Sequence, residues 1–211
     1  QTLNLQTAQK NSLVAKEQQQ TQLIAETQDQ ESAYQQLVSE AQQHLQQVSA
    51  QQRAFFANMN SAGVVGDFTY SNWSGNQGCG GGYPYCGAQD SSIDPWGLYN
   101  RECVSYVAWS LATRFHRYVA NFSGQGNAYQ WPESAVEYSG AQVVQNPQPG
   151  DAVILPATSN NFAPIGHAMV VEAVNGDSVN VSQYNFGGTG EYSTMTIGTG
   201  GVIFLRFPAA N

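Results

Sequence analysis

The most constraining feature of this sequence is an abrupt change in composition near residue 60. All 21 glycines and all 8 prolines lie after that point, whereas residues 1–59 contain neither and are rich in Gln, Ala, Glu and Leu. Because this stretch lacks the residues that break helices, it predicts one continuous helix. At about 1.5 Å per residue, such a helix would be roughly 85 Å long. We therefore expect a helix over 1–59, a linker over 60–78 and a folded domain over 79–211.

The apolar residues of this predicted helix follow a heptad pattern, which is typical of a coiled coil. Some positions of the seam are polar, so the seam is weak. A helix of this length is too long to lie across one small domain, so it needs a partner to bury its apolar face. That partner would be a second copy of the chain, giving a homodimer through 1–59, an antiparallel helix from sequence upstream of Gln1, or another protein such as a membrane-bound regulatory complex. The alternative is a Gln-rich disordered tract. The seam residues are Leu13, Ile24, Tyr34, Val38, Ala41, Leu45, Val48, Phe55 and Met59.

The charge and hydrophobicity of the chain exclude several classes of protein. Only 10% of the residues are charged, and the net charge is −8. Because an acidic protein is a poor partner for phosphate backbones, we expect no nucleic-acid binding. No run of about 18 apolar residues is present, so the sequence predicts no membrane-spanning helix. The 41% hydrophobic content is sufficient for a packed core.

The three cysteines fall into two groups. Cys79 and Cys86 lie in a Gly-rich loop, at a spacing that allows a disulfide. The alternatives are two reduced thiols or a two-cysteine metal site, although structural zinc usually has four ligands. A disulfide indicates an oxidising compartment, so we expect a secreted or extracellular protein. Cys103 is left over as a candidate reactive thiol. We expect no metal and no cofactor.

The folded part of the sequence predicts helices followed by strands. We expect a helix from Asn100 to Ala112 and another from Ala128 to about Ser139. An Asn-Gly turn at 175–176 predicts a hairpin between two of the strands that follow. Helices first and antiparallel strands afterwards indicate an α+β fold. The expected strands are Ala152–Leu155, His167–Val174, Val179–Tyr184 and Val202–Phe207.

Cys103 and His167 are the candidate nucleophile and base. With Asn100 as the N-cap, Cys103 would be the third helical residue, where the helix dipole favours a thiolate. The alternative is a small cysteine buried in the core. His167 begins a strand after a Pro- and Gly-containing loop, where it can face the start of a helix. The alternative is a hydrogen-bonded structural histidine.

Strand alternation predicts which residue orients the His167 imidazole. Glu172 lies on the opposite face of the same strand, roughly 16 Å along it, and is therefore a poor candidate. A tight hairpin returns the end of the next strand to the side of His167. Gln183 and Asn185 are the best-placed residues, because their amide oxygens can accept a hydrogen bond from an imidazole N–H.

These residues resemble those of the CHAP domain, the cysteine, histidine-dependent amidohydrolase/peptidase family. The resemblance covers about residues 85–207 and implies a papain-like fold that cleaves amide bonds in peptidoglycan. It implies that Cys103 attacks, that His167 is the base, and that Gln183 or Asn185 orients the imidazole. The matching segments, in the order of the family, are Arg101–Val107, Pro149–Val153, Gly166–Glu172 and Val181–Asn185.

Two positions depart from the family's usual pattern. Many members carry Glu where this chain has Gln183, and an amide cannot stabilise the imidazolium with a charge. Members often carry Gln immediately before the nucleophile, where this chain has Glu102. We expect the backbone N–H of Cys103 to be one donor to the oxyanion.

The leading interpretation is a secreted, cell-wall-associated peptidoglycan hydrolase, either an amidase or an endopeptidase. By analogy with stalked family members, it would act in cell division or daughter-cell separation under a membrane-bound complex. The alternative is a catalytically silent cell-wall-binding or scaffolding module, which the amide at Gln183 favours. Trp73 and Trp96 lie in loops and are candidates for stacking on substrate. Trp109 and Trp131 fall in helical apolar patterns and are expected in the core.

Overall fold

The computed structural model describes residues 27–28, 30–44, 46–47, 50, 63–158 and 162–210. The chain divides into two units, with the boundary between Gln46 and Gln47. The first unit is helical over 30–44. Tyr34 and Leu37, two of its large apolar side chains, are 63% and 65% exposed, respectively. A helix is thus confirmed for this stretch, while most of the remaining residues of 1–59 lie outside the described residues and the coiled coil stays a prediction.

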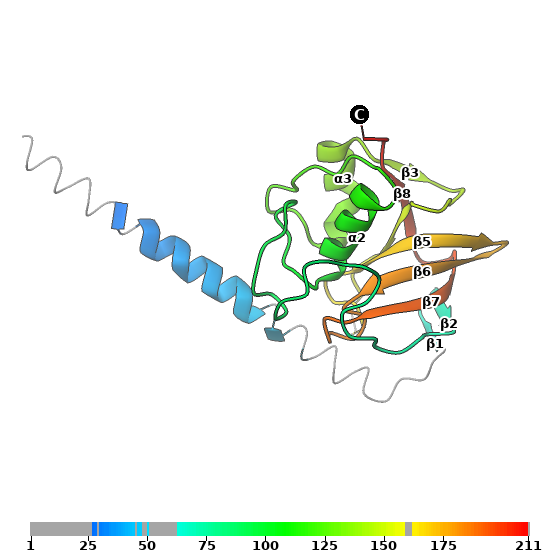
Figure 1. Cartoon of the computed structure of the whole chain (residues 1–211), viewed down its shortest axis with the longest axis horizontal. Coiled ribbons are helices and arrows are strands. Elements are labelled where there is room, and N and C mark those ends of the chain that lie inside the picture. Colours follow the sequence, from blue (N-terminus) through cyan, green and yellow to red (C-terminus); the bar gives the residue numbers. More distant parts are fainter. Residues whose placement is uncertain are drawn as a thin grey trace, which may run out of the picture. The chain divides into compact units, whose positions relative to one another are not determined.

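The second unit is built on an eight-stranded sheet in which every neighbouring pair is antiparallel (Figure 1). The spatial order is β1-β2-β7-β6-β5-β4-β8-β3. The β5–β6 hairpin turns at Gly176, as the Asn-Gly signal predicts. The strands are β1 (Gly63–Val65), β2 (Phe68–Ser71), β3 (Gln142–Val144), β4 (Ala152–Leu155), β5 (His167–Asn175), β6 (Ser178–Tyr184), β7 (Tyr192–Gly198) and β8 (Ile203–Arg206).

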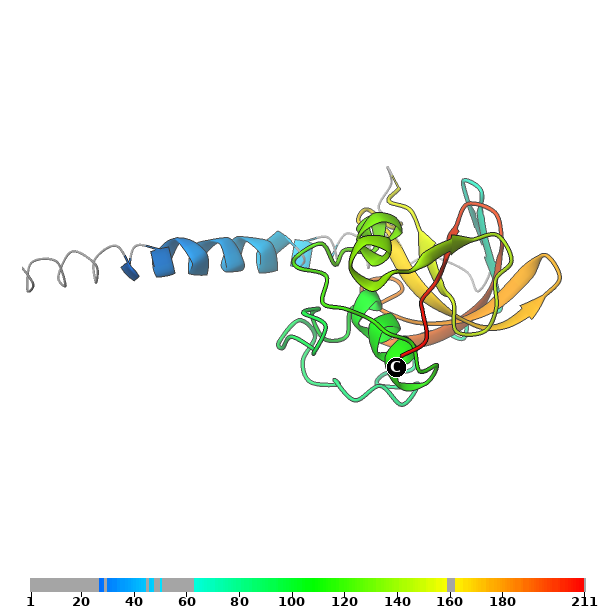
Figure 2. The same cartoon turned by 90° about the horizontal axis from the view of Figure 1, so that it is seen from above.

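Two α-helices and a 3-10 turn cover one face of this sheet (Figure 2). Helix α2 (Cys103–Thr113) has no Gly or Pro, and its first nine residues are all buried. Helix α3 (Trp131–Ser139) follows the turn η1 (Ala128–Gln130) and ends at Gly140, whose left-handed backbone suits glycine. Trp109 and Trp131 both belong to the core cluster on this face, as the sequence predicts.

A second core cluster covers the other face of the sheet. Along β5 the side chains alternate between the two clusters: Ala168 and Val170 pack on the helical face, and Met169 and Val171 on the other. The second cluster contains Phe162, which precedes β5 in the chain. The antiparallel sheet with helices segregated to one face confirms the mixed α+β class.

Two segments differ from the expected organisation. Residues 63–71, expected within a linker, form the strands β1 and β2, and Phe68 and Tyr70 of this segment are buried in the core. Strands β3 and β7 were also not expected. Strand β7 has Thr, Ser and Gly among its residues, so its alternation of buried and half-buried side chains is weak in the sequence. Within the described part of the chain, no helix is long and apolar enough to cross a membrane.

Candidate active site

Cys103 is the first residue of α2, and its side chain is 8% exposed. The expectation that Asn100 caps this helix is wrong, because the N-cap residue is Glu102. The Asn100 side chain is instead occupied by loop backbone: it accepts from Ser92 N–H and donates to the carbonyls of Tyr85 and Ala88. Cys103 is therefore the first helical residue, two positions nearer the helix start than a cap at Asn100 would place it.

His167 is the first residue of β5, and its imidazole is bound by Gln183. The distance from His167 Nε2 to Gln183 Oε1 is 2.8 Å, and both side chains are buried. Gln183 Nε2 donates to Ser193 Oγ, which turns the amide oxygen toward the imidazole. His167 Nε2 is then the protonated nitrogen and Nδ1 the one with a lone pair. Of the two candidate orienting residues, Gln183 thus contacts the imidazole.

The glycine before His167 has a steric role. Gly166 has φ = 77°, and a Cβ atom there would lie 2.8 Å from the backbone nitrogen of Tyr129 and 2.9 Å from the carbonyl oxygen of Leu155. Backbone atoms cannot move aside as a flexible side chain can, so only glycine fits this close approach. The Gly-His pair in the sequence is therefore a requirement of the turn that leads into β5.

The Cys103 thiol lies against the start of β5. The backbone N–H of Ala168, the residue after His167, is within hydrogen-bonding reach of the sulfur, as are the N–H groups of Cys103 and Val104. The described residues show no hydrogen bond between the thiol and the imidazole, whose Nε2 is directed to Gln183. The structure thus brings Cys103 beside the residue that follows His167.

Burial keeps both reactive groups neutral. Burial, reinforced by the charge of Glu102, raises the pKa of the Cys103 thiol to about 12. Burial lowers the pKa of His167 to about 4, against the opposing effect of its bond to Gln183. Desolvation and the neighbouring carboxylate thus oppose the thiolate that the helix dipole is expected to favour, and their effect on the thiol pKa exceeds that of the three N–H groups at the sulfur.

Asn185 binds Glu102, and none of the hydrogen bonds of its side chain among the described residues goes to the imidazole. Its Nδ2 lies 2.9 Å from both carboxylate oxygens of Glu102. Its Oδ1 accepts from Gly190 N–H at 2.7 Å and from Gln89 Nε2 at 3.2 Å. The backbone of Asn185 is left-handed (φ = 59°), which turns the chain at the end of β6. This turn directs the amide toward the start of α2, so strand alternation does not predict its direction.

Glu172 is bound away from the imidazole, as strand alternation predicts. It forms a bidentate pair with Arg114, with both distances 2.8 Å, and accepts from Ser182 Oγ. The hairpin register shifts between Val171 and Ala173, so Glu172 sits in a β-bulge. Its role here is to connect β5 to the end of α2.

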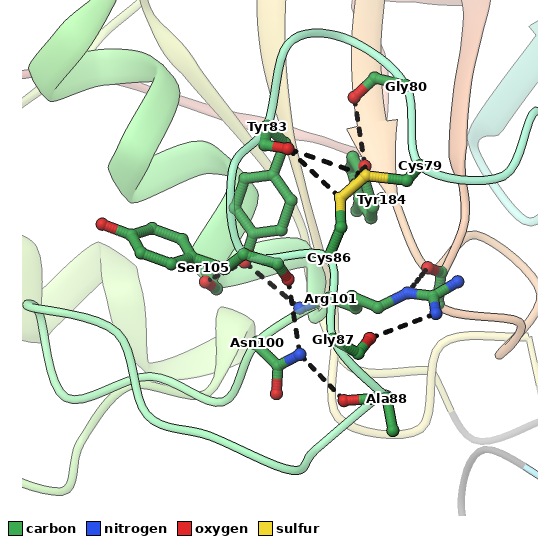
Figure 3. The surroundings of a disulfide bond; sticks show 12 residues. Cys79, Gly80, Tyr83, Cys86, Gly87, Ala88, Asn100, Arg101, Ser105 and Tyr184 are labelled. Carbon is green, nitrogen blue, oxygen red and sulfur yellow. Dashed lines mark hydrogen bonds between the residues drawn. A yellow bond between two sulfur atoms is a disulfide. The ribbon is translucent and has the colours of Figure 1, made fainter.

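The loop closed by the Cys79–Cys86 disulfide lies beside the residues that precede Cys103 (Figure 3). Cys79 and Cys86 are bonded, with their Cα atoms 5.9 Å apart, which confirms the predicted pairing. Arg101, with φ = 65°, donates from Nε to the carbonyl of Gly190 and from Nη1 to that of Gly87. Tyr83 Oη contacts Ser105 Oγ and accepts from the Arg101 backbone N–H. The loop is thereby tied to the first turn of α2.

The Pro-Gly-Asp segment and the two loop tryptophans have structural contacts. Asp151 is fully buried and pairs with Arg206 through both of its oxygens. Trp73 is partly buried and packs edge-on against Phe186, whose ring lies 5.5 Å from that of His167. Trp96 is partly buried against the helical-face core. The role of Trp73 and Trp96 in substrate binding stays a prediction.

Several residues around the site have no signal in the sequence. Asp90 and Gln89 reach Glu102 from an irregular loop, and Ser193 reaches Gln183 from β7. Long-range contacts from loops have no periodicity by which they could be recognised. The departure at Glu102 from the usual Gln was the one sequence feature that marked this region. Among the described residues, no group of three or more His, Cys, Asp or Glu side chains is arranged to hold a metal.

Comparison with known proteins gives one family and a small set of structures. No curated protein matches the chain. A solved structure of N-acetylmuramoyl-L-alanine amidase from Staphylococcus aureus is 25% identical, with a TM-score of 0.46, over 56% of this chain and 33% of that one. The crystal structure of Ly7917 is 25% identical, with a TM-score of 0.41, over 52% of this chain and 54% of that one. The chain thus spans about a third to a half of these proteins.

The family comparison covers the segment that carries the candidate site. Residues 93–185 match the family described as the CHAP domain. This range includes the starts of α2 and β5 and ends at Asn185, so it contains all four candidate catalytic positions. This match to residues 93–185 confirms the resemblance that the motifs of the sequence predict.

Proposed function

We propose that this chain is a peptidoglycan hydrolase that cleaves an amide bond with Cys103 as nucleophile and His167 as base. The observation that carries the proposal is the bond between His167 Nε2 and Gln183 Oε1, which leaves Nδ1 as the basic nitrogen at the start of β5, where the Cys103 thiol also lies. The CHAP domain family and the amidase named above support the substrate class.

The reaction begins with a neutral pair. As Cys103 Sγ forms a bond to the substrate carbonyl carbon, its proton passes to His167 Nδ1. The negative charge that develops on the carbonyl oxygen is stabilised by backbone N–H donors, for which the first turn of α2 is the candidate source. Thiol–imidazole contacts in such sites often shorten only when substrate binds.

The second half of the reaction releases both products. The imidazolium returns its proton to the leaving amine as the C–N bond breaks, leaving a thioester on Cys103. Water then attacks the thioester, His167 takes a proton from the water, and the thiol leaves with that proton. The products are a free amine and a carboxylic acid. Gln183 holds the imidazole in one tautomer throughout, and no ion pair supports the imidazolium.

The cellular setting is also a proposal. The Cys79–Cys86 disulfide supports an oxidising compartment, and it thereby supports the proposed location outside the membrane at the cell wall. The exposed Tyr34 and Leu37 of the N-terminal unit support assembly through residues 1–59, with a second copy or with a membrane-bound division complex. Such assembly would localise the hydrolase during daughter-cell separation.

Digestion of purified peptidoglycan followed by mass analysis of the fragments tests this function. An amidase would release peptides with a free N-terminal alanine from intact glycan strands, and an endopeptidase would shorten the peptides instead. The Cys103→Ala variant is the matched control and should release no fragments. If the native chain binds peptidoglycan without cleaving it, the chain is a binding module.

A further inference from the structure

Glu102 is a buried carboxylate immediately before the nucleophile. It is the N-cap residue of α2, yet its side chain makes no capping hydrogen bond to the helix. Its oxygens instead accept from Asn185 Nδ2 and, at 3.0 Å, from Gln89 Nε2. Glu102 therefore connects the start of the nucleophile helix to the end of β6 and to the loop that contains Gln89.

A second carboxyl group faces Glu102. The side chain of Asp90 lies within hydrogen-bonding reach of that of Glu102, and the backbone of Asp90 is left-handed, with φ = 58°. Asp90 Oδ1 is buried and accepts from no donor among the described residues. Two carboxyl groups can form a hydrogen bond only when one of them carries a proton. A proton shared with Glu102 would satisfy both groups.

The charged groups around this pair do not neutralise it. Asp90 faces Glu102 from the loop, Asn185 presents a neutral amide from the end of β6, and the Cys103 thiol follows on α2. Arg101 is adjacent in the chain, but its guanidinium binds the carbonyls of Gly87 and Gly190. Within residues 63–158 and 162–210, the ion pairs are Arg114–Glu172 and Arg206–Asp151, and neither includes Glu102.

We propose that Glu102 and Asp90 form a proton-sharing pair that positions the start of α2 and controls the reactivity of Cys103. With one proton, the pair has a single negative charge and holds the loop against α2. When that proton leaves to solvent, two negative charges, one on the buried Glu102 and one on the half-buried Asp90, face each other beside the thiol and oppose formation of its thiolate. Its significance for hydrolysis rests on the proposed function, whereas its effect on the thiol does not.

The pH range follows from the direction of the shifts. Burial, together with the charge of Asp90, raises the pKa of Glu102 to about 7, and burial also raises the pKa of Asp90. A carboxyl whose pKa is raised on folding stabilises the fold below its unfolded value and loses that contribution as pH rises through its folded value. The change should therefore fall near neutral pH, with the pair intact on the acid side.

Alkylation of Cys103 by iodoacetamide in the full chain tests the pair without requiring hydrolysis. The other two cysteines are in a disulfide, so the label reports Cys103 alone. In the native chain, the logarithm of the alkylation rate should rise with pH, but it should rise less steeply near pH 7, where the pair loses its proton. We call this flatter part of the profile the lag. Glu102→Gln should remove the lag, because its amide can donate to Asp90 and accept from Asn185 without a charge.

The expected difference is largest in alkaline solution. A nearby carboxylate shifts a thiol pKa by about one unit or more, which corresponds to a rate difference of roughly three- to tenfold after the loss of nucleophilicity is included. Glu102→Gln should exceed the native rate by that factor at about pH 8.5 and equal it below about pH 6. Asp90→Asn should abolish the lag near pH 7 but retain the slower alkaline rate, because Glu102 stays charged.

Glu137→Gln is the matched control, because it makes the same carboxyl-to-amide change on the exposed face of α3 and should reproduce the native profile. Parallel pH profiles for the native chain, Glu102→Gln and Asp90→Asn would overturn the proposal. If Glu102→Gln does not fold, as judged by its thermal unfolding, Asp90→Asn alone decides the outcome. If the alkylation profile shows the lag but the chain does not hydrolyse peptidoglycan, the pair is supported and the proposed function is rejected. If the chain hydrolyses peptidoglycan but shows no lag, the proposed function is supported and the pair is rejected.

Discussion

The imidazole of His167 and the thiol of Cys103 are held by two different kinds of structure. His167 is oriented by Gln183 and Ser193, neutral side chains on adjacent strands of the sheet. Cys103 follows a carboxylate, Glu102, that is held by irregular loops and by the left-handed residue Asn185. We call His167, Gln183 and Ser193 the imidazole half of the site, and Cys103, Glu102 and Asn185 the thiol half. The imidazole half depends on strand register, whereas the thiol half depends on loops and on charge. The two halves should therefore respond differently to substitution, to pH and to reduction.

Removal of the nucleophile should have the largest effect. Cys103→Ala and Cys103→Ser should reduce hydrolysis by at least about a thousandfold, because both remove the attacking sulfur. Both side chains fit a helix, so circular dichroism and the unfolding temperature should stay close to native values. Fragment release from peptidoglycan measures the activity, and near-native release by Cys103→Ala would exclude the proposed mechanism.

Gln183→Ala should be the next largest change, confined to the imidazole half. Loss of the orienting bond should cost roughly 10- to 100-fold in turnover, as small misplacements of a catalytic group do. The Cys103 alkylation profile should keep its lag near neutral pH, because the thiol half is unaltered. A lag that disappeared in this variant would show that the two halves are not separable.

The Gln183→Glu variant tests the role of residue 183 through the pH dependence of hydrolysis. His167 has a pKa near 4 in the native chain, so its base form persists in mildly acidic solution and activity should fall only near that pH. A carboxylate at position 183 raises the pKa of His167, which should move the acid limb of the pH–rate profile upward. Activity at alkaline pH should be retained or increased. An unmoved acid limb would mean that residue 183 does not act on the imidazole.

Asn185→Ala should cost more activity than Glu172→Ala, although Glu172 is the charged residue. Asn185 holds Glu102 beside the nucleophile, so a loss of about tenfold is expected. The Arg114–Glu172 pair is about one-third exposed, so its loss should cost at most about 1 kcal/mol of stability and little activity. Asn185→Gly is the backbone control, because alanine is strained at φ = 59° and glycine is not. Equal turnover for Asn185→Gly and the native chain would refute a role of the amide.

Opening the disulfide should produce a smaller effect, mainly on the thiol half. The Cys79→Ser/Cys86→Ser variant should lose roughly 2–3 kcal/mol of stability, from the entropy of the short loop. Because this loop anchors Asn100 and Arg101, turnover should fall several-fold while the acid limb set by His167 is unchanged. Thermal unfolding and the pH–rate profile measure these effects. Intact-mass analysis should show two hydrogens lost from the native chain, and a disulfide that included Cys103 would contradict both assignments.

Removal of residues 1–62 should have the smallest effect on either half. A chain that begins at Gly63 should be monomeric by light scattering and at least as active on soluble peptidoglycan fragments. The full chain should associate as its concentration rises, because its helix has an apolar face to bury. If both chains are monomeric, residues 1–62 do not provide the predicted assembly surface.

Much of the imidazole half could be predicted from the sequence, because its residues follow regular strands. The Asn-Gly turn sets the β5–β6 hairpin. Alternation along β6 places Gln183 beside His167, and alternation along β5 excludes Glu172. The Gly-His pair and the cysteine at the start of an apolar helix are local features as well. These predictions needed only residue types, spacing and the period of a strand or helix.

The thiol half was decided by tertiary structure. Asn100 is a helix cap by propensity, but the carbonyls of Tyr85 and Ala88 occupy its side chain, and Asn185 turns away from the imidazole because its backbone is left-handed. The pKa of the Cys103 thiol likewise depends on burial and on Glu102, which raise it, whereas the helix dipole that the sequence suggested would lower it. Cap propensity, strand alternation and the helix dipole are local rules. Burial and contacts between distant loops arise only when the chain is folded, so the sequence predicted the position of the candidate nucleophile, whereas its burial and its neighbouring carboxylate were decided by the fold.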